Sequence, residues 1–60
     1  MTPEMKELAI FLKAAGVDLE TAVRISFRVE KPEKLEKMVV WMKANKTATV
    51  GEICKMSRRL

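Results

Sequence analysis

Apolar residues recur along this chain at the three- and four-residue spacing of amphipathic helices, while the alternation that marks a strand is nearly absent. The pattern predicts four helices, over residues 3–15, 19–29, 32–45 and 50–59. The predicted fold class is therefore all-α, a small four-helix domain. We expect one domain over residues 1–60, built as two helical hairpins, 3–29 and 32–59.

Capping residues mark the predicted helix ends. Thr2 and Asp18 are suitable N-caps, because their side-chain oxygens accept hydrogen bonds from free backbone N–H groups. Gly16 tolerates the left-handed conformation that commonly ends a helix. Thr49 and Glu52 have the spacing of a capping box, in which each satisfies a free backbone donor of the other.

The two hairpins resemble each other when the chain is aligned with itself at an offset of thirty residues. Met5, Leu8, Phe11, Leu12, Lys13 and Ala14 then fall on Leu35, Met38, Trp41, Met42, Lys43 and Ala44. One extra residue in the second loop places Ala22, Val23, Ser26 and Arg28 over Ile53, Cys54, Ser57 and Arg59. Because a single hairpin cannot bury its own apolar face, two packed together form the smallest core.

The helical stripes predict a core and also leave apolar side chains outside it. The predicted core residues are Met5, Leu8, Ala9 and Leu12 in the first helix and Leu35, Met38, Val39 and Met42 in the third. Ile10 and Val40 project toward the polar side, and Phe11 and Trp41 lie at the edge of the stripe. The second and fourth helices have wide apolar arcs as well. A chain this short has too little interior to cover all of these side chains.

Ile10, Phe11, Val40 and Trp41 are the residues that we expect at a protein interface. Large apolar patches seldom stay exposed, and aromatic side chains dominate interface hot spots. Either aromatic residue taken alone is more readily explained as core, whereas Ile10 and Val40 favour the interface. A homodimer is the simplest way to cover such a surface, and an adaptor role toward another protein is the other.

The composition offers few groups for chemistry. The single cysteine, Cys54, excludes an internal disulfide, and the absence of histidine argues against a zinc site. There is no tyrosine either, and Ser26 and Ser57 have no nearby general base. We therefore predict that the protein is not an enzyme and has no catalytic residues, metal, cofactor or small-molecule substrate.

No targeting segment is recognisable in this sequence. The first residues lack the basic region of a signal peptide, and the apolar run Leu8–Leu12 is far shorter than a membrane span. Together with the unpaired Cys54, these features predict a cytoplasmic protein that does not use the membrane as a partner.

Positive charge is concentrated in the second half of the chain. The net charge is +4, and residues 31–60 hold eight basic and three acidic side chains. Glu30 with Lys34 and Glu33 with Lys37 are expected ion pairs at helical spacing. Five basic residues have no acidic residue four positions away and are candidate nucleic-acid contacts: Lys43, Lys46, Lys55, Arg58 and Arg59. A solvated polar face is the alternative explanation for them.

Residues 35–57 resemble the first two helices of helix-turn-helix domains. The resemblance lies in an amphipathic helix, the connection Lys46-Thr47-Ala48-Thr49 and the capped segment Val50-Gly51-Glu52-Ile53-Cys54. It implies contact with DNA, although such domains add a recognition helix that is not predicted after residue 59. The leading prediction is a non-enzymatic protein-interaction or adaptor module that self-associates. The alternative is a small basic nucleic-acid-binding regulator.

Overall fold

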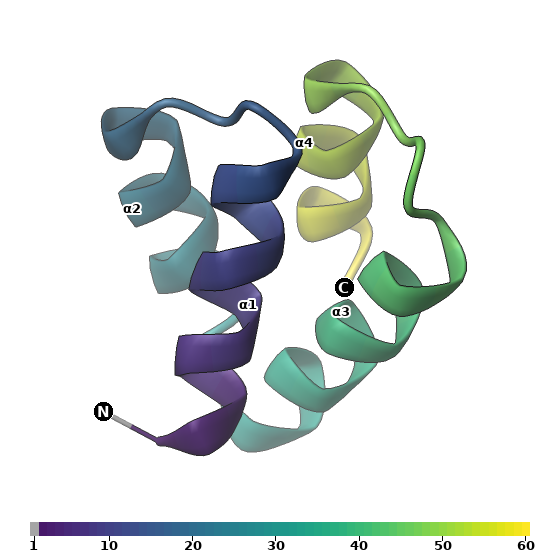
Figure 1. Ribbon diagram of the computed structural model, residues 1–60. Coiled ribbons are helices and arrows are strands. Elements are labelled where there is room, and N and C mark those ends of the chain that lie inside the picture. The colour runs from purple at the N-terminus through teal and green to yellow at the C-terminus, as the bar shows by residue number, and fades with distance from the viewer. Residues whose placement is uncertain (1) are drawn as a thin grey trace.

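Figure 1 shows the computed structural model, which describes residues 2–60 as four helices and no strands. The helices are α1 (Pro3–Ala14), α2 (Leu19–Arg28), α3 (Pro32–Ala44) and α4 (Val50–Arg59). In Figure 1, α1 rises through the front, α2 returns at its left, α3 crosses the lower right and α4 lies at the upper right, above α3. The predicted small all-α fold is confirmed, and each helix ends within one residue of its predicted end.

The predicted caps are present and account for the helix starts. Thr2 Oγ1 accepts a hydrogen bond from the backbone N–H of Met5 at 3.2 Å, and Asp18 caps α2 in the same way. In the capping box, Glu52 N donates to Thr49 Oγ1 at 3.2 Å and Thr49 N donates to Glu52 Oε1 at 3.0 Å. The free N–H groups of these three helix starts are thus partly satisfied by their own sequence.

The turn between α1 and α2 depends on Gly16, whose φ is 83°. Gly16 N donates to the carbonyl of Lys13 at 3.1 Å, and Val17 N donates to the carbonyl of Leu12 at 3.0 Å. These two bonds form a Schellman motif, which requires a left-handed residue where Gly16 stands. Val17 is buried beyond the turn, so the chain reverses and α2 runs back along α1.

Ten hydrophobic side chains form the core. They are Leu8, Leu12, Val17, Ile25, Val29, Leu35, Met38, Val39, Met42 and Ile53. The most extensive helix contact is between α1 and α3, followed by α1 with α2; α4 meets α2 and α3 over smaller areas. The two halves are therefore joined mainly through their first helices, and the second hairpin is held together only loosely.

Two of the eight predicted core positions, Met5 and Ala9, are not buried. Met5 is half-buried and Ala9 is exposed, whereas the other six are buried. Both residues line the space between α1 and α2. Met5 also borders a hollow next to the start of α3. The helical stripe of α1 is wider than the area that α3 covers, so its α2 side is left at the surface.

The ion pairs also differ from those predicted. Within residues 2–60, carboxylates and basic groups meet at two places, Arg24 with Glu20 at 2.8 Å and Lys43 with Glu7 at 3.0 Å. The predicted pairs of Glu30 with Lys34 and Glu33 with Lys37 are not formed. Glu30 precedes the first residue of α3, so helical spacing does not apply to it. Nothing in the structure explains the separation of the second pair.

The capping box gives a testable pH dependence. Hydrogen bonds from the backbone N–H and the hydroxyl of Thr49 lower the pKa of Glu52 below its ordinary 4.5. A carboxylate whose pKa is lower in the folded state contributes stability above its unfolded pKa and loses it as the pH falls through the folded pKa. Gln also completes a capping box but does not titrate.

We therefore expect wild type to melt at a higher temperature than Glu52→Gln at about pH 7, with a difference that narrows as the pH falls below the ordinary carboxyl pKa. Thermal unfolding followed by circular dichroism across this pH range measures the difference. A difference that is independent of pH would contradict the assignment.

Candidate functional site

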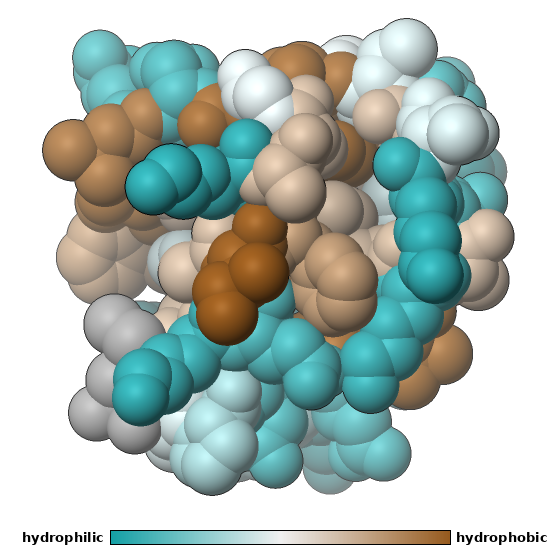
Figure 2. Space-filling model, in the orientation of Figure 1, coloured by the Kyte–Doolittle hydropathy of each residue, from teal (hydrophilic) through white to brown (hydrophobic). Residues whose placement is uncertain are grey.

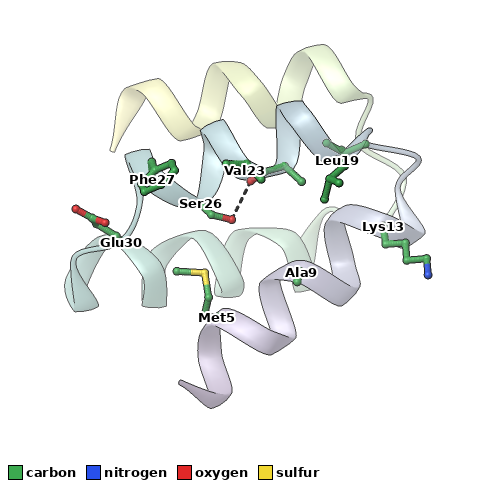
Figure 3. A pocket seen from close by; sticks show the side chains of 10 residues that line it. Met5, Ala9, Lys13, Leu19, Val23, Ser26, Phe27 and Glu30 are labelled. Carbon is green, nitrogen blue, oxygen red and sulfur yellow. Dashed lines mark hydrogen bonds between the residues drawn. The ribbon is translucent and has the colours of Figure 1, made fainter. Parts of the chain in front are cut away.

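A broad apolar groove, open to solvent, lies between α1 and α2, with a volume of about 740 Å³. We call it the α1/α2 groove. Its lining consists of Met5, Ala9, Lys13, Val17, Leu19, Ala22, Val23, Ser26, Phe27 and Glu30. Figure 3 shows that α1 supplies one wall and α2 the other. Eight of these ten residues carry no charge, so the groove suits an apolar partner.

Three large side chains of α2 form a ridge along this groove. Leu19, Val23 and Phe27 follow one another at one-turn spacing and are 82%, 44% and 68% exposed. Side chains four residues apart lie above one another on a helix, so the three form a continuous apolar edge. Leaving three such side chains in water is unfavourable, since each forgoes part of the roughly 1.5–3 kcal/mol that full burial provides. This ridge is therefore the surface with most to gain from a partner.

The walls beside the ridge are lined by small residues. Ala9 belongs to α1, and Ala22 and Ser26 belong to α2. The hydroxyl of Ser26 donates to the carbonyl of Ala22 at 2.8 Å, as the dashed line in Figure 3 shows. Because this bond satisfies the hydroxyl inside its own helix, Ser26 adds little polarity to the groove.

Opposite charges stand at the two ends of the groove. Figure 3 places Lys13 at the end near Leu19 and Glu30 at the end near Phe27. Both side chains are exposed, and within residues 2–60 neither has an ion-pair partner. The groove is thus apolar along its length, with a positive and a negative end.

The four residues predicted at an interface lie on two helices, Ile10 and Phe11 on α1 and Val40 and Trp41 on α3. Val40 and Trp41 line a second hollow, between α3 and α4, together with Met56 and Leu60. Val40 is 60% exposed and Ile10 67%, in agreement with their predicted projection away from the core. Phe11 and Trp41 are half-buried and pack against the core. Each aromatic side chain is thus partly a core residue and partly a surface residue. In Figure 2, apolar areas over α1 are bordered by hydrophilic side chains.

The five predicted nucleic-acid contacts do not share one environment. Lys43 was expected to lack an acidic neighbour, but its Nζ lies 3.0 Å from Glu7 Oε1 of α1. Sequence spacing missed this pair because it joins two helices. The other four, Lys46, Lys55, Arg58 and Arg59, are exposed. Arg28, which the prediction omitted, donates to Ser57 Oγ at 3.3 Å and so adds a positive charge beside the basic end of α4.

The α1/α2 groove itself was not predicted as a site. The apolar arc of α2 was visible in the sequence, but the side of α2 that stays uncovered depends on tertiary packing. The internal repeat shows this directly, because Met5, Ala9 and Ser26 line the groove while their counterparts Leu35, Val39 and Ser57 are buried. The equivalent helix face is therefore buried inside the fold in the second half and open to solvent in the first half.

The described residues provide few groups for bond-making chemistry. Within residues 2–60, no three Cys, Asp or Glu side chains lie close enough together to hold a metal ion. Cys54 is half-buried on α4. A hydrogen bond from Thr21 lowers the pKa of Asp18, which is a helix cap like Glu52. No helix of the described chain has the length and apolar character to cross a membrane.

The fold and the site together define a small four-helix domain with an apolar surface groove. No protein-family model, curated protein or solved structure matches the chain. A function must therefore be inferred from the α1/α2 groove and from the exposed basic residues on and before α4.

Proposed function

We propose that this protein is a non-enzymatic protein-interaction module that binds an apolar helical face in the α1/α2 groove. The observation that supports it most is the exposed ridge of Leu19, Val23 and Phe27 beside a groove of nearly uncharged lining. Binding sites for amphipathic helices have this form, with a hydrophobic groove that accepts side chains spaced at helical intervals. Burying the ridge would supply the favourable free energy of association.

The interface at Ile10, Phe11, Val40 and Trp41 stays a prediction beside this one. The exposure of Ile10 and Val40 supports it. Charged residues, among them Glu33, Glu36 and Lys37, border the hollow that Val40 and Trp41 line. The α1/α2 groove takes precedence because its ridge is larger and its charges are confined to the two ends.

Site-specific photo-crosslinking tests the proposal without knowledge of the partner. A benzophenone amino acid replaces Phe27 in the groove, and in a matched control it replaces Arg24, which is exposed on the same helix but outside the groove lining. In cells that produce the protein, irradiation should yield a defined protein adduct from position 27 and none from position 24. The adduct mass distinguishes a second copy from a different protein. Absence of any adduct at position 27 would overturn the proposal.

Binding to nucleic acid is the second candidate function, and it rests on exposed basic residues of α4 and of the connection before it. Lys46, Lys55, Arg58 and Arg59 are exposed, and none of them has a carboxylate partner among residues 2–60. Arg28 lies near Arg58 and Arg59 through its bond to Ser57. Exposed basic side chains of this kind can neutralise phosphates of a nucleic-acid backbone, which is a sequence-independent interaction.

Fluorescence anisotropy with a labelled DNA duplex tests this second function. If the four exposed basic residues each neutralise one phosphate, the logarithm of the binding constant should fall against the logarithm of salt with a slope of about −3.6. The double variant Arg58→Ala with Arg59→Ala should halve that slope to roughly −1.8. No binding at low salt, or a slope unchanged in the double variant, would exclude the basic end of α4 as a nucleic-acid site.

A further inference from the structure

We propose that the occupant of the α1/α2 groove is a second copy of this chain, with the α2 helices of the two copies crossing antiparallel at Val23. This inference rests on the proposed function and names its partner. A two-fold axis at Val23 brings the ridge of each copy into the groove of the other. The interface is then isologous, so the same surface serves both copies and the assembly closes as a dimer.

The charges at the ends of the groove favour this arrangement. The two-fold axis reverses the direction of the groove, so the Lys13 end of one copy meets the Glu30 end of the other. Each dimer would contain this ion pair twice, once at each end. Since neither side chain has an ion-pair partner within residues 2–60, both are available for it. A groove with like charges at both ends would repel its own copy.

The shape of the two walls is also self-complementary. Leu19, Val23 and Phe27 form a ridge of residues four apart, which is the row that interlocks in the commonest class of helix packing. The eight-residue step from Leu19 to Phe27 rises about 12 Å along the helix. In the antiparallel crossing, Leu19 of one copy lies near Phe27 of the other. The small residues Ala22 and Ser26 leave room for the opposing ridge.

The area required is within reach of a chain of this size. A stable specific interface buries about 600 Å² or more on each partner. That is roughly one-seventh of the 4389 Å² surface of the protein. The α1/α2 groove and the exposed side chains of its ridge would form the centre of that area.

A head-to-tail stack of copies is the main alternative to the closed dimer. Within the chain, the two halves already pack head to tail, because one face of the second half contacts a different face of the first half. The groove-equivalent face of the second half is buried against the first half, and Lys43 bonds to Glu7 across the contact. The counterpart of Lys43 in the repeat is Lys13, and that of Glu7 is Lys37. A stack of copies would therefore oppose Lys13 to Lys37. This like-charge contact favours the closed dimer.

Charge reversal tests the dimer, with sedimentation equilibrium as the measurement. Wild type should sediment at twice its 6.9 kDa chain mass at high concentration. Lys13→Glu alone and Glu30→Lys alone should each weaken dimerisation about tenfold, since each turns two attractive pairs into repulsive ones. The double variant should recover the affinity of wild type. A mixture of the two single variants should form a heterodimer, because both of its end contacts are again attractive.

The matched control is Lys37→Glu, a charge reversal at an exposed lysine outside the α1/α2 groove. The affinity of the closed dimer should not change, whereas a head-to-tail stack would be strengthened and would grow beyond two copies. Circular dichroism verifies that each variant is folded.

Three results would overturn the dimer: a wild-type monomer at every concentration, a dimer indifferent to both single reversals, or larger assemblies strengthened by Lys37→Glu. A monomer that still crosslinks to another protein through position 27 would contradict the dimer and leave the proposed function intact. Loss of every crosslink at position 27 would contradict both.

Discussion

The packing of α1 against α3 determines where the other two helices can lie. Leu8 and Leu12 of α1 and Met38 and Met42 of α3 are buried in one core, and these two helices have the most extensive contact of the fold. Apolar area removed from water is the main favourable contribution to folding, so a chain of sixty residues must use this seam fully. The remaining helices then cover its flanks. The α4 helix contributes Ile53 to the same core that includes Ile25 and Val29 of the first half.

This arrangement accounts for both the stability problem of a short chain and its uncovered surface. Two similar hairpins pack with unlike faces, since the second half buries Leu35 and Val39 while the first half leaves Met5 half-buried and Ala9 exposed. An internal repeat that packs in this way always leaves one face without a neighbour. Here that face is the α1/α2 groove. The opposite charges at its two ends distinguish it from a surface that is only left uncovered. In the proposed dimer, association and stability would be linked through the same surface.

The local structure could be predicted from the sequence because its causes are local. The helices begin and end where the capping residues indicate, because each cap bonds only to groups a few residues away. These caps are Thr2, Asp18, Gly16 and the Thr49–Glu52 box. The exposure of Ile10 and Val40 followed from helical periodicity in the same way. The α1/α2 groove and the bond of Lys43 to Glu7 depend on how helices distant in sequence meet, and a helical wheel contains no information on that.

In the proposed dimer, the Leu19–Val23–Phe27 ridge contacts the same ridge of a second copy. An isotope-filtered nuclear Overhauser experiment on a mixture of labelled and unlabelled protein measures such contacts directly, without any substitution. We expect intermolecular signals between the ring of Phe27 and the methyl groups of Leu19, with Val23 contacting its own counterpart at the axis. Intermolecular signals at Trp41 and Val40 instead, or none at a concentration where the protein is dimeric, would contradict this arrangement.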